Sequence, residues 1–427
     1  MNPLSIATKG KGIAGTAKRA NAIRTRYGVT LFLMDRQISH FVQILEKFGG
    51  TATFPITATV LARAKGYARK YQDRKIEFAL HGYTHVDHTN LTLGEQFDYA
   101  LKALKIFNDE GLVCSGFRCP YLRWNEDTLA AIRRAGFLYD SSQGVAWDVV
   151  DEVNTEAYER VLEFYDAKPV DGFPALPYLE NGLVRIPYCL PDDEALVERF
   201  HIQDPELMFQ LWSAILAESY NSGELFTLGL HPERLAECAT PLLKILQAAR
   251  QLSPPVWFAR LDEIAHWWKE RTESNVTVER LNDRDYEISV AGPKGVTILA
   301  RNLDVITPTV AWDSQYQRSP STILRFQADH RPFIGLSPSS SPRLASFLRQ
   351  QGYITELVAD GQKYTYYLDR PNFERQDQRS LLEELERRNF PLVRLGKWPD
   401  GARSALSITG DIDALTIWDY SLRLFGR

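Results

Sequence analysis

The chain has 427 residues, 44% of them hydrophobic and 24% charged, a composition that predicts a globular protein of two or three domains. A net charge of -4 argues against a nucleic-acid or anionic-membrane partner, and no apolar run reaches the length of a membrane span. The four cysteines are scattered, which indicates neither a disulfide framework nor a zinc motif.

The N-terminal stretch is basic and lacks the apolar core of a signal peptide, so we expect a cytoplasmic protein. Apolar periodicity and capping signals predict helices over 17–27, 35–48, 61–73, 93–111, 125–136, 205–221 and 239–252. β-prone runs predict strands over 51–57, 75–80, 114–121, 138–142, 183–188 and 224–231, and 256–271 reads as a strand leading into a helix. This alternation predicts an α/β fold whose parallel sheet is open or closed into a barrel.

The character of the sequence changes after residue 272. Short strands over 276–282, 285–291 and 296–303 are joined by polar turns. Helices are expected after "LSPSSSP" and over 378–389, and Asp360-Gly361 predicts the turn of a hairpin within 353–369. Residues 273–394 are therefore predicted to form a smaller α+β region.

Two histidines mark the end of the strand over 75–80. His81 follows this strand directly and His85 comes four residues later, so both rings can face one point. Neutral imidazoles bind zinc and similar divalent metals, although solvated histidines in a capped loop would show the same spacing. A position at the carboxyl end of a strand favours a functional site.

Two further strands end in residues that can carry chemistry. Arg118 ends one strand, and Tyr121, Trp124 and Trp147 could form an apolar or sugar-stacking wall near it. His231 ends another strand and precedes a proline. Taken alone, each residue is more simply explained as structural: Arg118 as a surface arginine beside core aromatics, and His231 as a lone histidine. Three strands of one sheet that each end in a histidine or an arginine are harder to attribute to chance.

A site with two histidines needs a carboxylate as its third ligand. Asp35 lies at a helix start and is more simply an N-cap, whereas Asp87 lies just after His85. The stronger candidates are Asp411 and Asp413, because they end the apolar run "ALSIT" close to the end of the chain.

These motifs resemble the polysaccharide deacetylase (NodB-homology, carbohydrate esterase family 4-like) family, which are metal-dependent de-N-acetylases on an irregular (β/α)7-type barrel. "HGYTH" is similar to that family's H-S/T-x-x-H motif, with Gly82 in place of serine or threonine. "RCPY" resembles its R-x-P-Y motif, "LGLHP" its late histidine strand, and "TGDIDAL" its D-x-D motif. The likeness covers residues 17–270 and 400–427.

The order of the motifs differs, because D-x-D comes first in the family and last here. This resembles a circular permutation, with residues 1–272 forming the barrel from its second strand, 273–394 a small α+β insert, and 395–427 the displaced first strand and helix. Alternatively, the C-terminal stretch begins a second, truncated domain, and its acids serve another chain or none.

The resemblance implies one divalent metal, zinc by preference with cobalt, nickel or iron as alternatives, held by Asp413, His81 and His85. It implies Asp411 as general base, Arg118 as its partner, His231 as general acid and the Tyr121 backbone N–H as an oxyanion donor. Tyr83, Trp124 and Trp147 would contact an N-acetylated carbohydrate, Trp147 being a weak candidate for the family's tryptophan. Support lost at Gly82 would come from Thr84.

Other functions stay open at this stage. The same site residues would suit a hydrolase of a non-sugar amide. An iron(II) oxygenase also uses two histidines and a carboxylate, but usually on a β-sandwich. A degenerate barrel could serve as a carbohydrate-binding or scaffold module. Protein partners are not indicated by the sequence.

Overall fold

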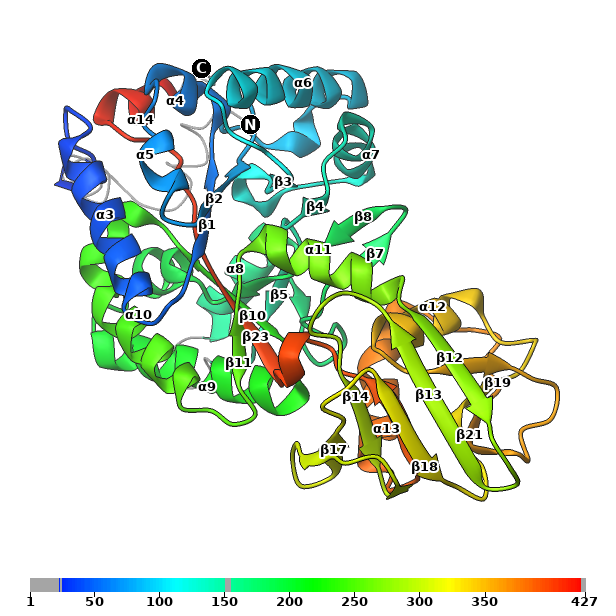
Figure 1. The fold of residues 1–427 in the computed structure, drawn as a ribbon. Coiled ribbons are helices and arrows are strands. Elements are labelled where there is room, and N and C mark those ends of the chain that lie inside the picture. The colour runs from blue at the N-terminus through cyan, green and yellow to red at the C-terminus, as the bar shows by residue number, and fades with distance from the viewer. Residues whose placement is uncertain (1–22, 24, 150–154, 424–427) are drawn as a thin grey trace.

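A large curled sheet forms the centre of the protein (Figure 1). The structure is a computed structural model that describes residues 23, 25–149 and 155–423. In the described residues the strand order is β6 (Lys168–Pro169), β5 (Gly144–Ala146), β9 (Tyr188–Leu190), β10 (Leu225–Leu230), β23 (Ser404–Gly410), β1 (Ala52–Ile56), β2 (Ile76–Leu80), β3 (Gly116–Phe117), β4 (Tyr139–Asp140), β8 (Leu183–Arg185) and β7 (Tyr178–Glu180), and β11 (Val256–Phe258) pairs with β23. All pairs are parallel except β7 with β8.

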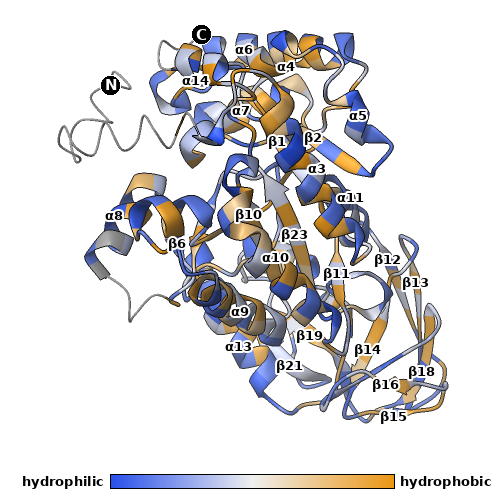
Figure 2. Cartoon of the chain, turned by 90° about the vertical axis from the view of Figure 1, so that its left-hand side faces the viewer, coloured by the Kyte–Doolittle hydropathy of each residue, from blue (hydrophilic) through white to orange (hydrophobic). Residues whose placement is uncertain are grey.

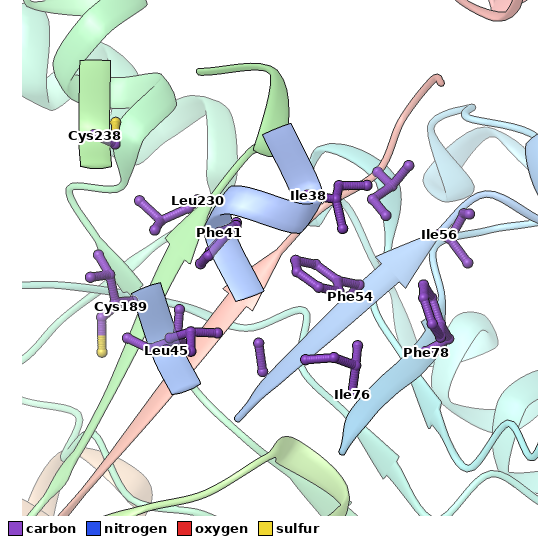
Figure 3. Packing of buried hydrophobic residues seen from close by; sticks show 14 of the residues in the cluster. Ile38, Phe41, Leu45, Phe54, Ile56, Ile76, Phe78, Cys189, Leu230 and Cys238 are labelled. Carbon is purple, nitrogen blue, oxygen red and sulfur yellow. The ribbon is translucent and has the colours of Figure 1, made fainter. Parts of the chain in front are cut away.

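Helices cover the sheet and supply the other half of its core. They are α3 (Phe32–Glu46), α4 (Ala58–Arg63), α5 (Arg69–Gln72), α6 (Leu93–Asp109), α7 (Glu126–Ala135), α8 (Thr155–Tyr165), α9 (Pro205–Ser222), α10 (Leu235–Arg250), α11 (Leu261–Thr272) and α14 (Ile417–Arg423). On α3, Ile38, Phe41 and Leu45 recur at helical spacing and pack on Phe54 of β1 and its neighbours (Figure 3). The outer helix faces are largely hydrophilic, whereas β11 and β23 are apolar over much of their length (Figure 2).

Strand β23 occupies an interior position in this sheet, although it comes last in the chain. Along one side it pairs with β10 from Leu225↔Ala405 to Leu230↔Gly410. Along the other it pairs first with β11 and then with β1, where Ala52 faces Ile408. "SALSIT" thus pairs in parallel beside "ATFPIT", and Asp411 and Asp413 follow a strand of the same sheet as the strand that ends before both histidines.

Residues 275–395 form three smaller sheets with two helices. The sheets are β12 (Asn275–Arg280), β13 (Asp285–Ala291), β18 (Ile323–Gln327) and β15 (Asp304–Val305); β16 (Val310–Ala311), β17 (Tyr316–Arg318), β14 (Ile298–Arg301) and β22 (Leu392–Leu395); and β20 (Thr355–Leu357), β19 (Arg331–Leu336) and β21 (Tyr364–Leu368). The helices are α12 (Pro342–Gln350) and α13 (Gln378–Arg387). The hairpin expected within 353–369 is wrong, because β20 and β21 each pair in parallel with β19, which lies between them.

This smaller region packs at the amino end of the large sheet. Leu225 is the first residue of β10 and Ala405 is the second of β23, and both share a core with Ile288, Ile298 and Trp398. The carboxyl ends of the same strands are left free for the candidate site, at the opposite end of the sheet (Figure 1).

The fold class predicted from sequence is confirmed as α/β with a barrel-like sheet, although the order ends at β6 and β7 and no pairing between described strands closes it. Most of the helix expected over 17–27 lies outside the described residues. None of the described helices combines the length and apolar character needed to cross a bilayer.

Candidate active site

Two histidines and one aspartate converge at the carboxyl ends of β2 and β23. His81 Nε2 lies 3.3 Å and His85 Nε2 lies 3.2 Å from Asp413 Oδ1. All three residues are buried. Their ligand atoms lie close enough together to hold one metal ion, and no other such group occurs among the described residues. Asp413 Oδ1 has no hydrogen-bond partner among the described residues, so this buried oxygen fits a role as a cation ligand beside the two imidazoles.

The protonation of these groups suits metal binding. The Arg118 carbonyl accepts a hydrogen bond from His81 Nδ1 at 3.0 Å, which leaves Nε2 with its lone pair toward Asp413. Burial, reinforced by the positive charge of Arg423, lowers the pKa of His85 to about 4. Burial alone would raise the pKa of Asp413, but Arg423 and the histidines hold it well below its usual range. The neutral imidazole of His85, the ring of His81 and the carboxylate of Asp413 therefore meet at one point.

Asp411 forms a buried ion pair beside this group. Its Oδ1 accepts a hydrogen bond from Arg118 Nη1 at 2.5 Å, and its Oδ2 lies 3.9 Å from His81 Nε2. Arg118 is fully buried, and its other nitrogens donate to the Ser141 carbonyl and hydroxyl oxygens. Arg118 is therefore not a surface arginine. Its buried guanidinium is fixed in place and orients the Asp411 carboxylate.

His231 follows β10 and is held by a second aspartate. Asp193 Oδ1 accepts from His231 Nδ1 at 2.6 Å, and Asp193 Oδ2 accepts from the His231 backbone N–H at 2.6 Å. Burial alone would lower the pKa of His231, but Asp193 raises it to about 10. His231 is therefore a protonated imidazolium near neutral pH.

The loops around the histidines contain strained backbone. Tyr121 has a φ of 59°, which side-chain-bearing residues rarely adopt, and its ring packs edge-on against His85. Gly82 has a φ of 76°, and a Cβ there would lie 2.8 Å from the Thr84 carbonyl oxygen. Glycine is thus required where the family has serine or threonine. Thr84 does not provide the support expected of it, because its hydroxyl has no hydrogen-bond partner among the described residues.

A small pocket of about 30 Å³ joins these groups. Its walls include both histidines of the metal-type cluster, Tyr121, His231, Asp411 and Asp413. Three predicted substrate residues do not line it: Tyr83 packs on Tyr99, Trp124 on Arg185, and Trp147 in the buried core.

The two alternative third ligands are engaged elsewhere. Asp35 lies inside α3, after its N-cap, and pairs with Lys70. Asp87 caps a short turn and pairs with Arg123.

Several pocket residues were not predicted from sequence. Asp192 and Glu194 line the pocket, and Asp193 between them holds His231. All three follow β9, so the same strand-end argument that singled out His81 could have indicated them. Arg423 belongs to α14, where Nη1 donates to Asp413 Oδ2 at 2.5 Å. Its spacing from Asp413 alone does not reveal that contact.

Comparison with known proteins finds relatives among the polysaccharide deacetylases. Residues 34–139 match the family model for polysaccharide deacetylase. The peptidoglycan deacetylase-like protein FGM2 of Gibberella zeae is 28% identical over 290 residues, with 60% of this chain and 81% of that protein covered.

Similar solved structures include a putative polysaccharide deacetylase from Mycobacterium smegmatis, at 22% identity and a TM-score of 0.42, covering 54% of this chain and 76% of that chain. A probable polysaccharide deacetylase from Pseudomonas aeruginosa PAO1 has 20% identity and a TM-score of 0.44, covering 56% and 76%.

Residues 34–139 match the polysaccharide deacetylase family model, so the resemblance expected from the motifs is confirmed over this segment. The matched segment contains His81, His85, Arg118 and Tyr121. It does not extend to His231 or to the two acids after β23, which only the fold brings to the same pocket.

Proposed function

We propose that the protein is a metal-dependent hydrolase that removes the N-acetyl group from an N-acetylated carbohydrate. One observation carries this proposal: a His-His-Asp cluster, an Asp411–Arg118 pair and a His231–Asp193 pair surround the same pocket. A metal ligand set, a base and an acid are the groups that amide hydrolysis requires.

His81, His85 and Asp413 would hold the metal, with zinc the preferred ion and cobalt, nickel or iron as alternatives. When bound, the metal would lower the pKa of a bound water and polarise the acetamide carbonyl. Arg423 would keep Asp413 Oδ2 engaged, which directs Oδ1 toward the histidines.

The two proton-transfer roles fall to the paired residues. Asp411 would accept the proton of the attacking water, with Arg118 fixing the carboxylate. His231 would donate its Nε2 proton to the departing amine, because Asp193 engages Nδ1 and keeps the ring charged. The backbone N–H of Tyr121 would donate to the developing oxyanion.

The pocket size favours a small acyl group. A volume of about 30 Å³ corresponds to two water positions or so, since one water needs roughly 10–15 Å³ of such space. An acetyl group fits, whereas the carbohydrate ring would have to lie outside this pocket.

We also propose that the chain is a circularly permuted member of its family. Strand β23 lies between β10 and β1, and the family match begins only at residue 34, on α3. Residues 1–272 and 395–427 would then make the deacetylase barrel, and 273–394 the insert. The acids serve their own chain, which disfavours the truncated second domain considered from sequence.

Acetate release in the presence of added zinc or cobalt tests this function. Wild-type protein should bind about one metal per chain and release acetate from an N-acetylated oligosaccharide. His81→Ala with His85→Ala should lose the metal, because two of its three ligands are gone. Asp411→Asn should retain metal yet lose roughly 10²–10⁴-fold in rate.

Full metal occupancy in the double alanine variant would overturn the ligand assignment. Metal binding without acetate release from any N-acetylated sugar would favour the non-sugar amide or the scaffold alternative. The parallel sheet already disfavours an iron(II) oxygenase.

A further inference from the structure

A second cavity lies at the other end of the strands that carry the candidate site. It has a volume of about 270 Å³, far larger than the first. Residues just before β10 (221–224) and just before β23 (402 and 403) form one wall. Residues 312–316 and α13 form the other wall, so the cavity lies between the large sheet and the smaller region. Pockets between packed units commonly hold small ligands.

The charges that line this cavity cancel in pairs, with one exception. Arg379 contacts Glu224 at 2.5 Å and Arg403 contacts Asp313 at 2.8 Å. Arg394 lies 3.5 Å from Glu386. Glu383 is half exposed and pairs with Arg387 at 3.0 Å.

Lys397 is that exception. It is 8% exposed, and its Nζ donates to the Ser222 carbonyl oxygen at 3.1 Å. No carboxylate of the described residues lies within ion-pair distance of it. Burial, and next the charge of Arg394, lowers the pKa of Lys397 to about 8. An unpaired buried ammonium is costly, and two of its three donors are left for a partner.

We propose that this cavity binds a small organic anion, with the carboxylate or phosphate on Lys397 and the body of the ligand beside Trp312. Such a group would supply the missing counter-charge. Trp312 is half-buried, its indole N–H donates to the Gly401 carbonyl, and its ring lies edge-on to Tyr316 and beside the Arg403 guanidinium. The ring therefore offers the ligand a fixed apolar surface at the cavity wall. A volume of about 270 Å³ suits a molecule the size of a substituted monosaccharide. This inference does not depend on the deacetylase function.

Isothermal titration with three probes tests the proposal: glucuronate, glucose 1-phosphate and glucose. Wild-type protein should bind at least one of the anions with a Kd below about 1 mM, and glucose at least tenfold more weakly. Which anion binds distinguishes a carboxylate ligand from a phosphate ligand. Lys397→Met should weaken the anion at least tenfold, whereas Asp411→Asn, at the opposite end of the strands, should bind it as wild type does.

Folding of the variant is checked by its melting temperature. Lys397→Met has similar length and removes an unpaired buried charge, so it should melt at or above the wild-type temperature. Trp312→Ala provides an independent variant and should also weaken the anion. Binding of neither anion, equal binding of glucose, or unchanged binding in Lys397→Met would each overturn the proposal.

Discussion

His231 and Asp193 show how one contact sets the chemistry of a side chain. Asp193 contacts both Nδ1 and the backbone N–H of His231, and the pKa of the imidazole is raised to about 10. Below that pH the ring keeps the proton that a general acid needs. The same pair stabilises the fold fully below about pH 6.5, the ordinary histidine value, and this contribution is lost as the pH rises through about 10.

Asp193→Asn should therefore move the alkaline limb of the pH–activity profile downward, toward the ordinary histidine pKa, because the carboxylate that holds the proton is gone. The profile of acetate release between about pH 6 and 11 measures this shift. Asp109→Asn removes an exposed acid on α6 and should leave the profile unchanged. An alkaline limb that stays in place in Asp193→Asn would contradict the role of this pair.

Gly82 gives a second prediction for a single residue. Gly82→Ser would restore the residue type usual in the family, yet it should destabilise the protein by about 1–3 kcal/mol. The reason is a left-handed φ together with a Cβ position 2.8 Å from the Thr84 carbonyl and 2.9 Å from Pro120 Cγ. Thermal melting measures the loss.

Gly94→Ser is the matched control for this change. Gly94 lies in α6 and a Cβ there meets no atom within 4 Å, so its melting temperature should not fall. A Gly82→Ser variant as stable as wild type would show that the loop can rearrange to accept a side chain.

At the scale of elements, β23 is a structural member of the sheet as well as a carrier of acids. All seven of its residues are buried, and it bonds to β10 on one side and to β1 and β11 on the other. Removing it would separate the two halves of the sheet.

Deleting residues 404–427 should consequently abolish the cooperative melting of the large sheet rather than only its activity, because β1 and β10 would lose their shared partner. Circular dichroism during heating provides the measurement. Full-length protein with Asp411→Asn and Asp413→Asn keeps the strand without its acids and should still melt cooperatively. Cooperative melting of the truncated chain would mean that β1 and β10 can pair without β23.

Which elements were predictable from the sequence depended on how local their signals are. The strands over 51–57, 75–80 and 224–231 were found because their apolar runs end at polar residues. The helix over 61–73 proved to be two short helices, α4 and α5. Asp360-Gly361 is a genuine turn signal, but a strand distant in sequence, β19, separates the two runs that it joins.

The same limit applies to the site. Strand ends indicated His81, Arg118, His231 and Asp411. The structure brings His81, His231 and Asp411 to one pocket, and Arg118 donates to Asp411 from behind it. Asp193 and Arg423 were missed because their roles depend on tertiary contacts with His231 and Asp413. Tyr83, Trp124 and Trp147, the aromatic residues expected to contact the substrate, do not line this pocket. Their role stays a prediction, because the carbohydrate would lie outside the pocket.

For the whole molecule, the arrangement of the two described ends bears on the proposed permutation. The rings of Tyr27 and Tyr420 have centroids 5.3 Å apart, and the backbone N–H of Ile417 donates to the Gly28 carbonyl at 3.0 Å. The residues that would flank a joint between residues 427 and 1 thus already pack together.

A rearranged chain that starts at Ala402, runs through residue 427 into residue 1 and ends at Gly401 should fold and bind about one metal, because every sheet contact is preserved. Melting and metal content measure the outcome. The same joint with the new ends placed between Leu228 and Gly229 interrupts β10 and should fail to fold. Failure of the first chain as well as the second would contradict the permutation.

The late position of β23 also determines when the protein can mature during translation. The ribosome releases β1 and β10 long before β23, so the facing edges of both strands stay unpaired until Ser404–Gly410 has emerged. Arg63 on α4 likewise cannot form its ion pair until Asp419, 356 residues later, has been synthesised. A nascent chain therefore holds His81 and His85 without Asp413, and the arrival of β23 both joins β1 to β10 and brings Asp413 to the two histidines.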